Sequence, residues 1–344
     1  ENEIINIFRN LKNTNSTGVD DVSQNIAKKS IHAIARPLMH IMNLSISTGK
    51  FPNRLKTAKI VPVPKTGDPY DICNHRPISL LPCFSKLLEK LVYVRLYKFL
   101  EHNNILYMHQ YGFRPNHSTD HALIDFNDTV CNALHSNKFV IGIFLDLSKA
   151  FDVMDHDILL SKLSRYGIRG IPYLWFKDYL TNRNQCTMYK THISKKLLIK
   201  TGIPQGSILG PLLFLLYVND LYCVSKLFHF IQYADDTCLI ASNYNQNDLI
   251  CQTNTELIKV VEWLRTNKLC LNVKKTKCIY FCLNNSRSIA LPKVQLDGEL
   301  IDFVDCHNFL GIHVDCYLKW DFHVRHVCNK ISKTIGILYK LKYT

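Results

Sequence analysis

The stretch Phe228–Ile240, FHFIQYADDTCLI, carries two adjacent carboxylates between two runs of aromatic and β-branched residues. Such runs around a short polar break predict a strand, a tight turn and a second strand. Because consecutive side chains of a strand point to opposite faces, only a turn lets Asp235 and Asp236 approach one site. An ordinary Asp-Asp turn is the simpler interpretation of the dipeptide alone. A divalent cation with oxygen ligands is the functional one, and residues elsewhere must decide between them.

A third carboxylate follows another predicted strand. Val140–Leu145 is a near-continuous apolar run that ends at Asp146, and such a run predicts a buried central strand. If this strand lies beside the hairpin of Asp235 and Asp236, three carboxylates meet at one site. Two metal ions held by such acids are a recurring arrangement for in-line displacement at phosphorus.

Two cations flank a second predicted hairpin. Residues 59–68 predict a strand that runs into a turn, and Arg76–Leu81 predict the returning strand. An antiparallel pair would direct Lys65 and Arg76 toward one anion, for which a phosphate group is the usual partner. Two solvated cations on a hairpin are the alternative.

Two loops add to this pattern. Gly202–Ser207 has glycines where backbone must approach another group closely. Gln110–Thr119 interleaves aromatic with basic side chains, which suits stacking on bases and holding phosphates. A packed loop is the alternative for the second.

The remaining elements follow from periodicity and capping signals, among which Ser118 or Thr119 is the predicted cap of a helix that runs toward His135. We predict helices over 1–50 (broken at Asn13–Gly18), 84–101, 119–135, 157–166, 171–180, 208–221, 246–267 and 320–342. We predict further strands near 185–190, 197–201, 278–283, 293–304 and 308–312.

Composition narrows the class of protein. The 344 residues are 47% hydrophobic and 20% charged, typical of a soluble globular protein with two or three lobes. The formal net charge of +14 favours a polyanionic partner such as nucleic acid. No apolar segment is long enough to cross a bilayer and no signal peptide opens the chain. Residue 1 is Glu inside a predicted helix, so we expect a piece of a longer protein.

The 13 cysteines predict buried free thiols instead of disulfides, because Cys131, Cys223, Cys238 and Cys278 lie in apolar runs. The spacing of His313, His323, His326 and Cys328 matches no common zinc pattern. We therefore expect no structural metal.

The ordered set of motifs resembles a reverse transcriptase of the non-LTR (LINE-type, jockey-like) branch. Phe144–Asp152, Gly202–Ser207 and Tyr233–Asp236 are similar to its motifs A, B and C. Asn74–Leu81 and Gln110–Arg114 resemble its fingers motifs, although His75 replaces a usual Tyr. Lys275-Thr276 resembles motif D, and Phe309–Gly311 resembles the primer-grip motif E.

The resemblance implies a catalytic centre of Asp146, Asp235 and Asp236 with two Mg²⁺ ions, Mn²⁺ being an alternative. The backbone carbonyl of Leu147 would complete one oxygen shell. Lys275 would donate a proton to the departing pyrophosphate.

It also implies the residues that hold the substrates. Phe151 would be a sugar gate whose ring excludes a 2′-hydroxyl and so favours deoxynucleotides. The triphosphate would be held by Lys65 and Arg76, and the nucleotide and template base bordered by Gln205 and Gly206. The residues expected at the template and primer are Gly112, Phe113, Arg114, Phe309, Leu310 and Gly311.

The fold implied is α+β, a right-hand polymerase with an antiparallel palm sheet backed by helices. We expect an N-terminal extension, the fingers and the start of the palm in 1–139, the palm with motifs A to E in 140–315, and the start of the thumb in 316–344. The function implied is RNA-directed DNA polymerase, with RNA template, DNA primer and dNTPs as partners and an endonuclease domain upstream. We expect synthesis in the cytoplasm, integration in the nucleus, and no secretion.

Three alternatives stay open. A domesticated, binding-only relative would keep the basic surface but lose the acids, all of which are present. A maturase-type cellular reverse transcriptase would carry a complete thumb and a maturation domain. A metal nuclease would use similar acids but has no need of Phe151 or of the Gly202–Ser207 loop.

Overall fold

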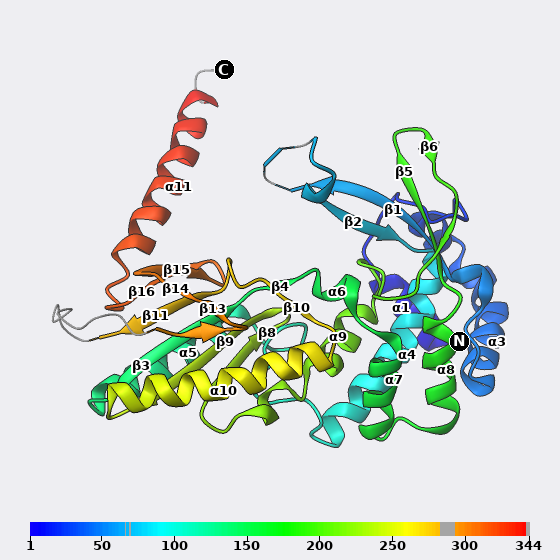
Figure 1. Ribbon diagram of the computed structural model, residues 1–344. Helices are drawn as coiled ribbons and strands as arrows, with labels where there is room; N and C mark the ends of the chain where they lie inside the picture. The colour runs from blue at the N-terminus through cyan, green and yellow to red at the C-terminus, as the bar shows by residue number, and fades with distance from the viewer. Residues whose placement is uncertain (66, 69, 283–292, 342–344) are drawn as a thin grey trace. The chain divides into compact units, whose positions relative to one another are not determined.

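The computed structural model describes residues 1–65, 67–68, 70–282 and 293–341 (Figure 1). The chain is a mixed α/β protein with several sheets, and it divides into two compact units. The first unit contains 1–107 and 149–219, and the second contains 108–148 and 220–344. Each unit is therefore built from two separate segments of chain.

A five-stranded sheet forms the centre of the second unit. Its strands are β3 (Phe139–Leu145), β8 (His229–Tyr233), β9 (Asp236–Asn243), β11 (Lys277–Phe281) and β14 (Asp302–Phe303), in the order β14-β11-β3-β9-β8. All neighbours are antiparallel except β11 and β14. The predicted buried strand and the predicted hairpin are both confirmed, and they lie side by side.

Helices cover this sheet because β3 is apolar on both faces. Helix α5 (Thr119–His135), which begins with a capping box at Ser118 as predicted, packs Phe126 near Phe144 of β3. Helix α10 (Gln246–Thr266) packs on β9, is capped by Asn245 and runs along the front of the sheet in Figure 1. The alternation of β3 thus directs Val140 and Phe144 to α5 and leaves Ile141 and Ile143 for the opposite face.

Three short strand pairs complete the second unit: β4 (Leu147–Ser148) with β10 (Cys270–Leu271), β12 (Gln295–Leu296) with β13 (Glu299–Leu300), and β15 (Cys306–Phe309) with β16 (Ile312–Asp315). The 3₁₀ turn η3 (Leu221–Val224) contacts α10. The prediction of one strand over 308–312 is wrong. Leu310 and Gly311 have φ of 50° and 90°, so they form a turn between two strands.

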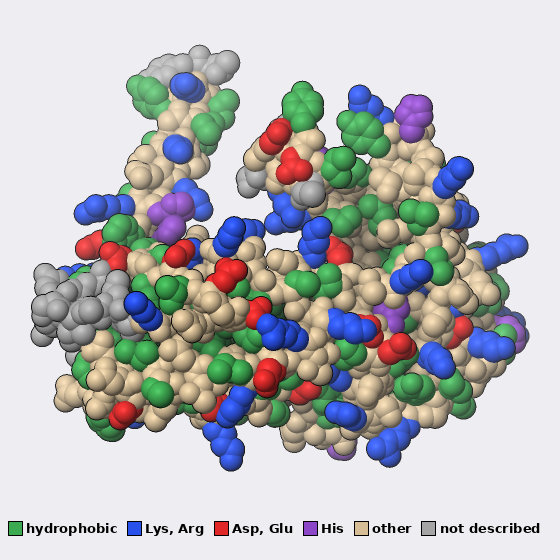
Figure 2. All heavy atoms as spheres, in the orientation of Figure 1, with side chains coloured by type: hydrophobic (Ala, Val, Ile, Leu, Met, Phe, Trp, Pro, Cys, Tyr) green, Lys and Arg blue, Asp and Glu red, His purple; other side chains and the backbone are tan. Residues whose placement is uncertain are grey.

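Helix α11 (Asp321–Leu341) follows β16 and buries none of its residues. Hydrophobic and basic side chains alternate along it in Figure 2. The predicted helix over 320–342 is confirmed within the described residues.

In the first unit, β1 (Thr57–Pro64) pairs antiparallel with β2 (His75–Leu80) and parallel with β5 (Asn184–Tyr189), which also contacts β6 (His192–Ile193) and β7 (Leu197–Leu198). The helices are α1 (Asn2–Asn10), α2 (Gln24–Lys29), α3 (Ile31–Thr48), α4 (Cys83–His102), α6 (Ala150–Val153), α7 (His156–Arg165), α8 (Gly170–Leu180) and α9 (Gly210–Val218), with 3₁₀ turns η1 (Asn53–Leu55) and η2 (Ile72–Asn74). The predicted helix over 208–221 is shorter than expected. It is apolar on every side and almost entirely buried.

The cysteines whose side chains are described are all free. Cys238 and Cys278 are buried as predicted, but Cys131 is half-buried and Cys223 exposed. Among the described residues, no helix has the length and apolar character that a membrane span requires.

Candidate active site

The three predicted acids lie at one end of the central sheet of the second unit. Leu145, the last residue of β3, pairs with Thr237 of β9. Asp146, directly after β3, and Asp236, the first residue of β9, are therefore the neighbours of this pair. Asp235 lies in the turn that joins β8 to β9, where Ala234 has a φ of 59°. The structure therefore brings together the acids of two segments far apart in sequence.

Like charges lie close to one another at this end of the sheet. The surrounding protein, and then the charges of Asp235 and Asp146, raise the pKa of Asp236 to about 6, although the residue's own surface is exposed. Burial also raises the pKa of Asp235, helped by Asp146 and opposed by a backbone hydrogen bond.

Carboxylate oxygens are hard ligands of the kind that Mg²⁺ and Mn²⁺ prefer. The residues present therefore fit a divalent cation in their chemistry. They do not form a closed set of ligands: among the described residues, only His109, Asp125 and His229 bring three ligand atoms within 4.8 Å of one another.

The backbone of Asp146 is held by the turn that carries Lys275. The Asp146 amide donates to Thr276 Oγ1 at 3.3 Å, and the Asp146 carbonyl accepts from the amide of Asn272 at 2.9 Å. The Asn272 carbonyl in turn accepts from the amides of Lys275 and Thr276. Thr276 is fully buried and Lys275 exposed, while the neighbouring Leu147 pairs with Leu271. The positioning role of Asn272 is not evident from the sequence.

The turn of Asp235 is held from the other side by the segment 109–114. The side-chain oxygen of Gln110 accepts from the amides of Gly112 and Ala234 at 2.9 and 3.1 Å. Gly112 is so close that an added Cβ would lie 2.2 Å from the nitrogen of Ala234. Gln110 is 1% exposed, and its contribution was missed because nothing in the local sequence marks it.

The other predicted template and primer residues differ in exposure. Phe113 is 44% exposed with a φ of 55°, and Arg114 Nη1 donates to the carbonyl of Gln110. Phe309 is buried, with its ring centroid 5.2 Å from that of Phe144. It therefore supports the turn of Leu310 and Gly311 from the core instead of facing solvent.

The first unit collects the predicted nucleotide-binding residues. Arg76 of β2 pairs with Val63, two residues before Lys65, so alternation places both cations on one face of the hairpin. The Lys65 amide donates to the carbonyl of Asn74 at 2.8 Å.

The loop Gly202–Ser207 is fastened on two sides. Gln205 Nε2 donates to Asp152 Oδ1 at 2.8 Å, and the Gln205 carbonyl accepts from the amide of Ser79 at 2.7 Å. Gly206 has a φ of 124°, and an added Cβ there would lie 2.6 Å from the carbonyl oxygen of Ser79. Phe151 stacks on Phe214 with ring centroids 4.4 Å apart. The loop thus joins β2 to the α6 segment.

A buried acid that sequence reasoning missed lies behind this loop. Glu89 of α4 is fully buried, and its Oε2 accepts from the amides of Ile208 and Leu209 at 2.6 and 3.4 Å. Burial raises its pKa, while the equally buried Arg183 opposes the shift. Glu89 therefore fixes the backbone between Ser207 and the first residue of α9, Gly210.

Comparison with known proteins identifies the family. The model of the family described as reverse transcriptase (RNA-dependent DNA polymerase) matches residues 63–314. The chain belongs to this reverse transcriptase family. The match contains every predicted site residue, from Lys65 to Gly311.

The chain is similar to proteins of insect transposable elements. The chain is 30% identical over 94% of its length to a Drosophila melanogaster protein described as "Probable RNA-directed DNA polymerase from transposon BS". It is 28% identical over 83% to the Drosophila melanogaster "RNA-directed DNA polymerase from mobile element jockey". It is 26% identical over 98% to the "Retrovirus-related Pol polyprotein from type-1 retrotransposable element R1" of Bradysia coprophila. The chain covers 36%, 32% and 34% of these relatives, about a third of their length.

Proposed function

We propose that this chain is the polymerase core of a non-LTR retrotransposon protein and catalyses RNA-directed DNA synthesis. The observation that carries the proposal is the group of three acids, Asp146, Asp235 and Asp236, at one end of the sheet. In the reaction a primer 3′-hydroxyl attacks the α-phosphorus of a dNTP, a new P–O bond forms, and pyrophosphate leaves. Membership of the reverse transcriptase family supports this chemistry.

The three acids, with the Leu147 carbonyl, would hold two Mg²⁺ ions or Mn²⁺ in their place. When bound, such ions lower the pKa of the attacking hydroxyl and offset negative charge on the phosphates. The chain's own contribution is to fix the acids: Asn272 and Thr276 hold the backbone of Asp146, and Gln110 holds the turn of Asp235. Lys275, on the turn bonded to Asp146, would give a proton to the leaving pyrophosphate.

The first unit would bind the nucleotide. Lys65 and Arg76, on one hairpin face, would hold the triphosphate. Phe151 would lie beneath the sugar and exclude a 2′-hydroxyl, kept in place by its stack on Phe214. Gln205 and Gly206 would border the nucleotide and the template base.

Template and primer would be contacted by the second unit, at Gly112–Arg114 and at the turn of Leu310 and Gly311 supported by Phe309. In this proposal the architecture is a right hand, with fingers in 1–139, palm in 140–315 and the start of a thumb in 316–344. The exposed apolar and basic face of α11 is consistent with a thumb helix.

The partners proposed are an RNA template, a DNA primer and dNTPs, which suit the net charge of +14. Since the relatives are about three times as long, an upstream endonuclease domain in the complete protein is also part of the proposal. We propose synthesis in the cytoplasm and integration in the nucleus.

Primer extension tests the proposal. The purified chain, an RNA template with a DNA primer, dNTPs and Mg²⁺ should give extended primer, and Asp235→Ala should give none. Asp128→Asn, which changes an exposed acid of α5, is the matched control and should extend normally. Equal extension by wild type and Asp235→Ala would overturn the mechanism, and binding of template without extension by wild type would favour the binding-only alternative.

A further inference from the structure

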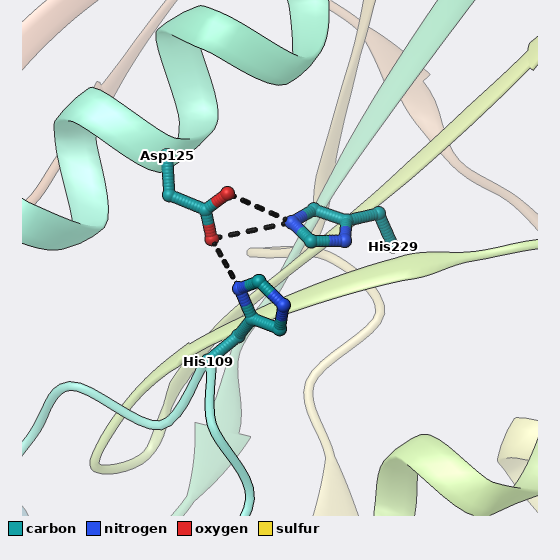
Figure 3. Close-up of side chains that lie close together, drawn as sticks. All are labelled: His109, Asp125 and His229. Atoms are coloured by element: carbon teal, nitrogen blue, oxygen red, sulfur yellow. Dashed lines mark hydrogen bonds and ion pairs between the residues drawn. The ribbon is translucent and has the colours of Figure 1, made fainter.

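A cluster of two histidines and an aspartate lies in the second unit (Figure 3). His109 precedes the bridge between Gln110 and Gln232, Asp125 lies on α5, and His229 is the first residue of β8. Asp235 lies two residues after Tyr233, the last residue of the same strand, so the cluster and the acids lie at opposite ends of β8. The proposed polymerase chemistry makes no use of the cluster.

The geometry of the cluster is close to that of a metal site. His109 Nδ1 lies 2.8 Å from Asp125 Oδ2, and His229 Nε2 lies 3.0 Å from Asp125 Oδ1. Ligand atoms at typical zinc distances in a tetrahedral site are roughly 3.3 Å apart. Each of these two imidazole nitrogens therefore lies within about half an ångström of the distance from an Asp125 oxygen that a shared ion would require.

The two imidazole rings lie close to each other and to the same carboxylate. Their centroids are 4.4 Å apart and their planes make an angle of 78°, and all three ligand atoms lie within 4.8 Å of one another. The side chains of His109, Asp125 and His229 are 23%, 16% and 28% exposed. An ion can reach such a site while most of its surroundings remain protein.

A supporting shell surrounds the aspartate. Tyr111 Oη donates to Asp125 Oδ2 at 3.0 Å, and Thr129 Oγ1 donates to Asp125 Oδ1 at 3.4 Å. Burial opposes ionisation of Asp125, but hydrogen bonds from His229 and His109 outweigh it and lower its pKa. Hydrogen-bond donors that orient a ligating carboxylate are a regular feature of metal sites.

We propose that His109, Asp125 and His229 bind a transition-metal ion of the Zn²⁺ type, with the fourth position left to water. Two imidazoles and one carboxylate are a common zinc ligand set. Mg²⁺ is a poor candidate, since it prefers oxygen ligands. The expectation that the chain holds no structural metal was based on short spacings, whereas these ligands are 16 and 104 residues apart.

The ion would fasten the segment before Gly112 to α5 and β8. The carbonyl of His109 accepts from the amide of Gln232, and the next residue, Gln110, holds Ala234. A site at one end of β8 thus supports the turn at the other end. The inference does not depend on polymerase activity, because metal binding is measured directly.

The test uses the full chain, freed of metal with a chelator and titrated with Zn²⁺ by calorimetry. We expect one ion per chain and a higher Tm with zinc. Asp125→Asn and His229→Gln should lose that ion and the Tm increase, and Tyr111→Phe should bind about tenfold more weakly. The matched controls Asp128→Asn and His135→Gln, exposed residues of the same helix, should bind as wild type does.

The 13 cysteines could hold zinc elsewhere, so the ligand type must be read as well. The visible spectrum of the Co²⁺-loaded wild type should show a tetrahedral ion without thiolate charge transfer. A thiolate spectrum, no bound ion, or undiminished binding in Asp125→Asn would each overturn the proposal. Because the spectrum is taken on wild type, a thiolate spectrum counts against the proposal even where a variant fails to fold.

Discussion

The two ends of β8 show two ways of keeping carboxylates inside a protein. At the end that leads to Asp235, three acids face one another, and burial and mutual repulsion raise the pKa of Asp235 and Asp236. At the other end Asp125 is surrounded by His109, His229 and Tyr111, and its pKa is lowered. The first arrangement gathers like charges, whereas the second sets one carboxylate among hydrogen-bond donors, two of which are imidazoles that a transition-metal ion would use as ligands. The first is therefore expected to serve chemistry and the second to serve structure.

The largest expected effect is on the rate of primer extension, and it distinguishes a catalytic from a structural role of the acids. Asp146→Asn should reduce primer extension by about a thousandfold or more, because divalent ions contribute several kcal/mol to such reactions. The Tm of the metal-free protein should not fall, since one of three repelling charges is removed. Extension kinetics and differential scanning fluorimetry check the two parts. Activity within tenfold of wild type would contradict the assignment.

The first unit contains a third arrangement, in which a single carboxylate is fully buried. Glu89 Oε2 accepts from the amides of Ile208 and Leu209, and the charge of Arg183 favours the ionised form of Glu89. Glu89→Ala leaves Arg183 buried without a counter-charge, which should cost about 3–5 kcal/mol of unfolding free energy. Urea denaturation measures this, with Glu101→Ala, an exposed acid of the same helix, as the control. Equal stability of the two variants would show that Glu89 is not needed.

The segment 109–112 links the two ends of β8, and Gly112→Ala breaks that link. Since the added Cβ would lie 2.2 Å from the nitrogen of Ala234, the turn of Asp235 must shift. A displacement of about 1 Å at a catalytic group can cost about a hundredfold in rate. Gly336→Ala, where nothing lies within 4 Å, should leave the rate of extension unchanged. Similar rates for both variants would remove the turn from the account.

Phe151, the proposed sugar gate, belongs to the first unit. Its replacement tests the choice between dNTPs and rNTPs, whereas replacement of the acids in the second unit tests the chemical step. Phe151→Ala should lower the preference for dNTPs over rNTPs by about tenfold, the scale of a small steric change in a pocket. The ratio of kcat/KM for the two substrates measures it. An unchanged ratio would assign sugar discrimination to another residue.

The smallest effect is the pH dependence of stability. The folded protein holds a proton on Asp236 more tightly than the unfolded chain, because the pKa is about 6 instead of 3.8. Its contribution to the stability of the metal-free protein should therefore fall as pH rises from about 4 to 6. Since Asp236 is exposed, we expect less than about 1 kcal/mol. Asp125 has the opposite sign: its contribution is present above its ordinary pKa and is lost as pH falls below it.

Thermal unfolding of Asp236→Asn and Asp125→Asn between pH 3 and 8 distinguishes the two signs. Asp236→Asn should remove the decrease with rising pH, and Asp125→Asn should remove the loss in acid. The same slope in both variants would contradict the comparison.

Local pattern predicts most elements of this fold. The apolar run before Asp146, the hairpin around Asp235 and the Ser118 cap are all where periodicity and capping place them. The turn at Leu310 was missed because a Leu with positive φ has no local signature. Patterns of side-chain type thus fix elements better than they fix turns.

The parts of the site that join distant segments could not be predicted. Gln110 and Ala234, or Asp125 and His229, are more than a hundred residues apart, and only the register of β8 beside β9 and α5 brings them together. Periodicity predicts that Glu89 lies on the helix over 84–101, but it does not reveal that the side chain accepts from backbone amides just before α9. Buried polar residues inside apolar patterns are the signal that such contacts leave in a sequence.

The most direct test of the account is single-nucleotide incorporation on an RNA template, followed in parallel for wild type, Asp235→Asn and Asp125→Asn over a range of Mg²⁺ concentrations. Wild type should add a deoxynucleotide in a Mg²⁺-dependent way, and Asp235→Asn should add none at any Mg²⁺ concentration. Asp125→Asn should still add the deoxynucleotide, but its Tm in the presence of zinc should be lower than that of wild type. Incorporation by Asp235→Asn at the wild-type rate would contradict the central claim that the acids beyond β8 carry the chemistry.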